Sequence, residues 1–333
     1  MACSCVHTMR CGFRHWAALL SVLAIICAPR GASAWCRTTT NQDFIATDGK
    51  PCDDVGKPIA WASKCTGYFV QSTGSPKRAL EPSAARRALQ AAFDAWPNAL
   101  CPFDPIACTG TTDLHPSITA RLLGAATCTE VGYCTTSPNA NLILFRDDAW
   151  PHSDGDSLLA LTTVSFDVAT AEIYDVDMEL NTALHRITID GTGFDLESIV
   201  THEAGHFFGL AHTQTTHGDA VMFPGSLRRT LVADDVCGIC AAYDPKRAAA
   251  CDERARHGLS ECTTLETSER SPSPRTAVGG GGCHCSAIRS ARTSNAMGLG
   301  DFALLLARGR RRHGRAERVV PARCLRQYPR SRA

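Results

Sequence analysis

Apolar positions at helical spacing predict three helices along the chain. The first begins at Pro82 and stops at Pro97. Its apolar positions are Ala85, Leu89, Ala92, Phe93 and Trp96. The second runs through DLESIVTHEAGHFFGL, in which Asp195 has the side chain of an N-cap residue and Glu197 lies in the first turn. The third is expected in LVADDVCGICAAY, at residues 231–243.

Alternation of apolar and polar residues between turn residues predicts the strands. A first strand is expected in GYFVQS (67–72), and two more in ITARLLGA (118–125) and NLILFRDD (141–148). Residues 160–181 predict two further strands joined by a turn near residues 167–171. The apolar positions of this pair are Leu161, Val164 and Phe166, then Ile173, Val176, Met178 and Leu180.

The two ends of the chain differ in composition from the middle. Residues 1–34 hold a basic start, an apolar run over 16–27 and a final Ala-Ser-Ala, which predicts a cleaved export signal. The apolar run is shorter than the ~20 residues that span a bilayer. Beyond Asp244 the chain becomes rich in Arg, Ser, Thr and Pro. We therefore expect a folded body over 35–245, a linker over 246–282 and a separate segment over 283–333.

Cysteine usage supports export. The chain has 18 cysteines, which pair in an oxidising compartment. Eleven lie between the signal and the four glycines at 279–282: Cys36, Cys52, Cys65, Cys101, Cys108, Cys128, Cys134, Cys237, Cys240, Cys251 and Cys262. An odd number cannot all pair internally, and the sequence leaves the connectivity open. Cys101 with Cys108, and Cys128 with Cys134, are close enough to close small loops.

Charge excludes one class of partner. The whole chain has a net charge of +1, but residues 35–282 carry 19 Lys and Arg against 31 Asp and Glu, a net charge near −12. A folded body that binds nucleic acid has the opposite balance. We therefore expect no nucleic-acid partner.

The stretch THEAGHFFGLAH predicts a metal site. His202 and His206, four apart on a helix, lie on one face and can both bind one ion at about 2.0–2.1 Å. Gly209 lets the chain leave the helix by a positive φ or a close backbone approach, so that His212 can turn back as a third ligand. Three protein ligands leave the fourth tetrahedral position open for water, which is typical of a catalytic zinc.

Glu203 follows the first histidine and predicts hydrolysis. It can take a proton from a water that zinc has activated and pass it to a leaving amine. A core helix with hydrogen-bonded histidines is the simpler alternative, but five such positions recur by chance on the order of once in 10⁴ chains. A surface protein that keeps zinc for binding without turnover is the other alternative, and the retained Glu203 argues against it.

These residues resemble a known family. His202 to His212 complete the pattern H-E-x-x-H-x-x-G-x-x-H of the metzincins, and Met222 in AVMFP resembles their methionine turn in its matrixin form. AFDAW (92–96) and LVADDVCGICAAYDP resemble the first and last helices of matrixins. The resemblance covers roughly residues 60–245.

The resemblance implies a fold and an activity. The expected fold is a two-lobed α+β metzincin domain with a twisted mixed sheet, an active-site helix and a C-terminal helix. The expected activity is that of a monomeric zinc-dependent metalloendopeptidase with one catalytic zinc and Glu203 as general base. An extended protein or peptide substrate would pair with an edge strand, which residues 160–164 match by position. Phe223 and Pro224 match the wall of the main specificity pocket.

The sequence also departs from vertebrate matrixins. It has no histidine between His152 and His185, so ligands of a second, structural zinc are missing. Asp175 and Asp177 resemble part of a calcium site, with solvated strand charges as the alternative. The sequence has no PRCGxPD cysteine switch before the domain, so any latency must be arranged otherwise. His217 is expected to be a loop residue.

The C-terminal segment carries a second resemblance. Four glycines, Cys283 and Cys285, the stretch AMGLGDFALLLA and the arginines at 310–312 resemble a myxobacterial C-terminal sorting signal. A basic tail without a fold is the alternative. We expect a secreted protein, either released or held at the outer cell surface, whose mature form ends near Cys285.

Overall fold

The computed structural model describes residues 35–252 with gaps, and the backbone of residues 291–298. The gaps are at positions 42, 45–46, 48–49, 51, 134–139, 154 and 214–217. The predicted export signal, His217, Cys134 and Cys262 lie outside the described residues, as does most of the predicted linker and C-terminal segment.

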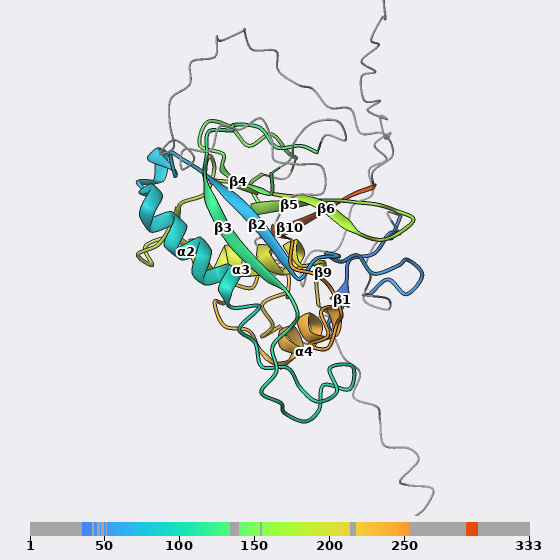
Figure 1. Cartoon of the computed structure of the whole chain (residues 1–333). Coiled ribbons are helices and arrows are strands. Elements are labelled where there is room, and N and C mark those ends of the chain that lie inside the picture. Colours follow the sequence, from blue (N-terminus) through green and yellow to red (C-terminus); the bar gives the residue numbers. More distant parts are fainter. Residues whose placement is uncertain are drawn as a thin grey trace, which may run out of the picture.

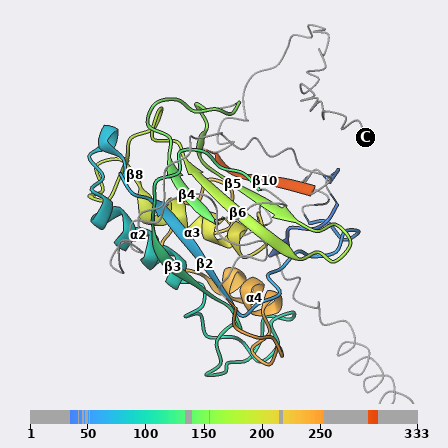
Figure 2. The ribbon, with the colours of Figure 1, turned by 45° about the horizontal axis from the view of Figure 1, so that its top comes forward.

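A six-stranded mixed sheet lies at the centre of the molecule, in the order β10-β5-β6-β4-β2-β3 (Figures 1 and 2). Its strands are β2 (Cys65–Gln71), β3 (Thr119–Ala126), β4 (Leu142–Phe145), β5 (Leu158–Phe166), β6 (Ile173–Leu180) and β10 (Ala291–Gly298). The pairs among β3, β2, β4 and β6 are parallel, whereas β5 is antiparallel to both β6 and β10. Successive strands are rotated relative to one another, as in other twisted sheets (Figure 1).

Two helices pack together against this sheet. Helix α2 (Pro82–Asp94) contacts β3, helix α3 (Leu196–Phe207) contacts β5, and the two helices contact each other (Figure 2). Tyr68 of β2 stacks on Phe93 of α2 with 4.1 Å between ring centroids. Phe93 meets Phe207 of α3 edge to face at 5.0 Å. Such aromatic pairs add about 0.5–1.5 kcal/mol beyond their buried area, so they fix α3 relative to the sheet.

The remaining elements are short or lie below the sheet in Figure 1. Helix α4 (Ala233–Ala242) contacts the antiparallel pair β1 (Cys36–Arg37) and β9 (Leu210–Ala211). A 3₁₀ turn, η1 (Pro76–Arg78), precedes α2, and β7 (Ile187–Thr188) pairs in parallel with β8 (Phe194–Asp195) before α3. Among the described residues, no helix combines the length and the apolar character needed to cross a bilayer.

The predicted helices and strands are confirmed, and the domain has an α+β fold. Each predicted apolar position of α2 and of the β5-β6 pair is buried, because these are the faces that meet in the core. Asp195 caps α3 as expected, since its carboxylate accepts the Ser198 N–H at 2.9 Å. Helix α2 ends at Asp94, and Trp96 lies buried in the turn that follows.

The expected loop closure between Cys101 and Cys108 is wrong. Cys101 bonds to Cys240, and Cys108 bonds to Cys237. The two partners are three residues apart on α4 and therefore share a face of that helix, which both cysteines of one loop can reach. The other described bridges are Cys36–Cys52 and Cys65–Cys251. Cys128 is also disulfide-bonded, but its expected partner Cys134 lies outside the described residues.

The expected end of the folded body at residue 245 is also too early. Residues 246–252, assigned above to the linker, run along the start of β2. Arg247 donates from its guanidinium to the carbonyl oxygens of Trp61 at 2.7 Å and Ser117 at 2.9 Å, and Cys251 is bridged to Cys65. Composition does not reveal this attachment, because a polar segment can bond to the body through carbonyl groups and a disulfide.

The edge of the central sheet differs from the one expected. The family resemblance places an edge strand at residues 160–164, but β10 pairs with β5 on the side away from β6. The strand β10 comes from the segment 283–333, for which a sorting signal or a tail without a fold was expected. β5 is therefore the second strand of the sheet and β10 is its edge.

Removing Cys65–Cys251 should destabilise the protein more than removing Cys36–Cys52. The bridged residues are 186 and 16 apart in sequence. The chain-entropy model then gives roughly 5 and roughly 3 kcal/mol of stabilisation. Denaturant unfolding of the two Cys→Ser double variants checks the order, and equal losses of unfolding free energy would contradict it.

Candidate metal centre

The three predicted histidines meet at the C-terminal end of α3. His202 and His206 lie on one face of the helix, and their ring centroids are 4.9 Å apart. His212 lies beyond the turn, 5.1 Å from His202 and 4.9 Å from His206 by the same measure. One candidate ligand atom from each lies within 4.8 Å of the others. Within the described part of the chain, this is the one group of His, Cys, Asp or Glu side chains found to be arranged for a metal ion.

Gly209 makes the turn that brings His212 back. Its φ is +81°, in the left-handed region, and a Cβ added there would lie 2.6 Å from the carbonyl oxygen of Ile59. The two predicted reasons for a glycine at this position, a positive φ and a close backbone approach, therefore apply together. The residues after the turn are held by β1, in which Cys36 pairs with Ala211. The Thr38 N–H also donates to the Gly209 carbonyl at 3.0 Å.

Backbone carbonyls orient two of the rings. His202 Nδ1 lies 2.6 Å from the carbonyl oxygen of Val221, and His206 Nδ1 lies 2.9 Å from that of Leu210. A carbonyl oxygen only accepts, so each Nδ1 carries the hydrogen and each neutral ring keeps a lone pair at Nε2. Such contacts are typical of histidines that bind a metal through the other nitrogen.

Burial keeps the rings neutral. It lowers the pKa of His202 to about 3, lowers that of His206 well below the ordinary value, and lowers that of His212 to about 4. His202 Nε2 lies 3.1 Å from His212 Nε2, and the buried His206 Nε2 has no protein partner. Two nitrogens on one tetrahedral zinc lie about 3.3 Å apart. The donor set and its unpartnered buried nitrogen therefore fit zinc.

Glu203 lies next to this centre and is fully buried. Its Oε2 accepts a hydrogen bond of 2.5 Å from the Thr162 hydroxyl of β5, and Oε1 has no protein partner. Burial raises the pKa of the Glu203 carboxyl to about 8, although the bond from Thr162 lowers it. A nearby divalent cation would favour the ionised form. Thr162 was not singled out from the sequence, where it reads only as one residue of a strand.

Met222, the residue predicted for a methionine turn, packs against α3 at Gly205. A Cβ added at Gly205, between the two helical histidines, would lie 2.1 Å from Met222 Sδ and 2.8 Å from Trp96 Cζ2. Gly205 therefore lets both large side chains pack directly against the helix backbone. The Trp96 indole also donates to the Thr201 carbonyl at 2.9 Å.

Asp235 is a supporting residue that the sequence analysis missed. Its carboxylate accepts the N–H groups of Val221 at 2.9 Å, Met222 at 3.0 Å and Val232 at 3.0 Å. Val221 in turn orients His202, so Asp235 holds residues 221 and 222 and, through them, a candidate metal ligand. Burial raises the pKa of Asp235, and the three N–H bonds oppose that shift. In the sequence Asp235 resembles an ordinary acid in the first turn of a helix.

The two strand acids proposed for a calcium site are buried rather than solvated. Asp175 and Asp177 are buried, because β6 lies between β5 and β4. Asp177 accepts the N–H groups of Gly132 at 2.8 Å and Leu142 at 3.1 Å. The interpretation as solvated strand charges is therefore wrong. Calcium at these residues remains a hypothesis.

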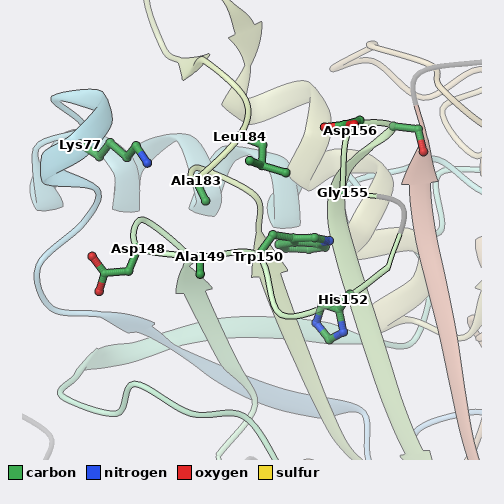
Figure 3. A pocket seen from close by; sticks show the side chains of 10 residues that line it. Lys77, Asp148, Ala149, Trp150, His152, Gly155, Asp156, Ala183 and Leu184 are labelled. Carbon is green, nitrogen blue, oxygen red and sulfur yellow. The ribbon is translucent and has the colours of Figure 1, made fainter. Parts of the chain in front are cut away.

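Two other histidines, His152 before β5 and His185 after β6, each contact another group of the protein. His152 Nε2 lies 2.8 Å from Glu179 Oε2, and His185 Nε2 lies 2.8 Å from the Gly155 carbonyl oxygen. His152 also borders a cavity of about 660 Å³ (Figure 3), which is separate from the three-histidine centre. The cavity is lined by Lys77, Asp148, Ala149, Trp150, His152, Gly155, Asp156, Ser157, Ala183 and Leu184. A single zinc per chain stays a prediction.

The mixed sheet, the helix with its three histidines and the methionine turn together define an α+β metzincin fold. Residues 132–244 match the family model described as Matrixin. A stretch of 55 residues is 46% identical to the protein named Metalloendoproteinase 1-MMP of Arabidopsis thaliana. That stretch spans 15% of this chain and 15% of the relative. The two findings support a matrixin-like metallopeptidase domain.

Asp235→Asn should weaken both the fold and the metal site. The amide keeps one acceptor oxygen but turns an NH₂ group toward a backbone N–H, at a cost of about 1–3 kcal/mol in unfolding free energy. Loss of support for a ligand typically lowers metal affinity about 10- to 100-fold. Unfolding and zinc competition with a chelator measure the two effects.

Asp244→Asn is the matched control, since Asp244 lies beyond the end of α4 and its carboxylate accepts the Lys246 N–H at 2.7 Å rather than an N–H of the methionine turn. Equal zinc affinity in the two variants would contradict the role given to Asp235.

Proposed function

We propose that this protein is a zinc-dependent metalloendopeptidase that hydrolyses bonds in protein or peptide substrates. One observation carries the proposal: three neutral histidines, two of them buried and His212 partly buried, converge beside the buried carboxylic acid of Glu203. His202, His206 and His212 would hold the ion. When bound, zinc lowers the pKa of a water toward about 7 and polarises a carbonyl group.

Glu203 is the proposed general base and acid. Thr162 holds one of its oxygens and leaves the other without a protein partner, so Oε1 is available to a water molecule. The carboxylate accepts a proton from the attacking water and then donates it to the leaving amine. Its position beside the three histidines allows both steps, because the same carboxyl oxygen can accept the proton from a water at the centre and pass it to an amine that leaves from the same place.

The non-catalytic alternative has no observation in its favour. A zinc site used only for binding needs no carboxylic acid beside it, and burying an ionisable group costs free energy. Glu203 is buried and makes one side-chain hydrogen bond, so its position is explained by a task in the reaction rather than by stability.

The proposal extends to substrate binding and location. We place an extended peptide along β5, where main-chain hydrogen bonds provide affinity. Phe223, half-buried, and Pro224, exposed, follow the methionine turn and are the proposed wall of a specificity pocket. Disulfides such as Cys65–Cys251 form and persist in oxidising compartments, which supports the proposal that the protein is exported.

Glu203→Gln should abolish peptide hydrolysis and leave zinc in place. The amide has nearly the same shape but cannot accept a proton near neutral pH. Loss of general acid and base assistance lowers the rate about 10²- to 10⁴-fold. Cleavage of a peptide library by the purified variants, with contaminating proteases excluded, measures it. Glu197→Gln, in the first turn of the same helix, is the control that should retain activity. Hydrolysis by Glu203→Gln at the rate of the unmodified protein would refute the assignment.

The protein should bind one zinc, and His202→Ala should lose it. Two remaining imidazoles give an incomplete site, so metal and activity fall together. His152→Ala should keep the zinc, because His152 contacts Glu179 rather than the proposed centre. Elemental analysis of dialysed protein checks both, and two tightly held zinc ions per chain would contradict the expectation.

A further inference from the structure

The strand β10 comes from far along the chain and covers the edge of β5. It pairs antiparallel with β5 in a register that matches Thr293 with Val164 and Asn295 with Thr162. The pairing runs from Ala291 opposite Phe166 to Gly298 opposite Leu158, so it extends along all of β5. Figure 2 shows β10 beside β5 at the border of the sheet. No part of β5 is left as an unpaired edge.

Main-chain geometry makes this pairing exclusive. In an antiparallel strand, successive N–H and C=O groups point alternately to the two neighbouring strands. β6 takes one set of the β5 groups, and β10 takes the other. An extended peptide from outside would need the second set. It can bind to β5 only after β10 leaves.

The covered edge also passes the proposed centre. Asn295 is opposite Thr162 in the register, and the Thr162 hydroxyl donates to Glu203. The backbone of β10 also approaches α3, the helix that carries Glu203 and two of the histidines. The strand therefore lies where the scissile part of a substrate paired with β5 would have to lie.

We propose that residues 291–298 occupy the substrate-binding edge from within the same chain and exclude extended peptides until the strand is displaced. The inference rests on the proposed function, because that function assigns the β5 edge to substrate. A segment on the same chain acts at an effective concentration of roughly millimolar order. A strand of modest intrinsic affinity therefore stays bound against a dilute peptide.

The position of the strand connects this device to processing. Residues 291–298 lie within the segment 283–333, whose predicted sorting signal would be removed near Cys285. Loss of that segment would remove the strand and uncover β5. Removal of the C-terminal sorting segment and activation would then be the same cleavage event.

The test uses the full chain with two matched double variants. Ser294→Pro with Asn295→Pro removes two successive N–H donors, one of which must point toward β5 in an antiparallel pair. Ser294→Ala with Asn295→Ala removes the same side chains and keeps both donors. Both pairs are made in the zinc-loaded Glu203→Gln background, so that binding is measured without cleavage.

Fluorescence anisotropy with a labelled peptide of residues 291–298 measures access to the edge. We expect the proline variant to bind this probe about 10-fold more tightly than the alanine variant. Hydrogen exchange gives a second readout. In the proline variant, alternate amides of residues 160–166 should lose protection, while those that bond to β6 keep it. Equal probe affinity and equal exchange in the two variants would overturn the proposal.

Activity separates this inference from the proposed function. With Glu203 restored, the proline variant should cleave a peptide substrate with a kcat/KM about 10-fold or more above that of the alanine variant. Equal, measurable cleavage by both would overturn the cis-acting strand. No cleavage by either, together with the expected difference in probe binding, would reject the peptidase assignment and support the occupied edge.

Discussion

The orientation of the candidate metal-binding histidines by backbone carbonyls is the constraint that governs the other contacts of this centre. A neutral imidazole binds zinc through one nitrogen only when the other carries the hydrogen. Val221 and Leu210 determine that state for His202 and His206 by accepting from Nδ1. Two unrelated stretches of backbone must therefore be held within hydrogen-bond distance of α3. Hydrogen bonds from the surrounding structure hold each of these two stretches of backbone in place.

The residues that hold the two carbonyl groups come from opposite ends of the folded part of the sequence. Val221 lies in the methionine turn, which Asp235 of α4 holds through three N–H groups. Leu210 lies in β9, where the Thr38 hydroxyl donates to the same carbonyl at 3.0 Å. The disulfides from Cys101 and Cys108 join α4 to the loop after α2. The candidate metal centre therefore depends on segments that fold together, although they are far apart in the sequence.

The strand β5 connects the sheet with the proposed chemistry. It pairs with β6 on one side and with β10 on the other, and its Thr162 donates to Glu203. Among the described residues, Glu203 has no other side-chain hydrogen bond, so a change in the position of β5 would directly move the partner of this carboxyl group. A strand or peptide paired with the β5 edge therefore lies close to the proposed general base. For this reason the proposal that β10 covers this edge bears on activity.

Local spacing in the chain is enough to predict the helices, the strands and the three candidate metal ligands. The apolar spacing predicted α2, α3 and α4 and five strands, because each element buries one face. The positions of His202, His206 and His212 around Gly209 follow from helix geometry and a single turn. Composition did not show that residues 246–252 attach to the body, that Cys101 and Cys108 bond to α4, or that β10 covers β5. These points, like the contacts of Thr162 and Asp235, become visible only in the folded chain. Each depends on contacts between residues far apart in the chain, and no local spacing in the sequence records such a contact.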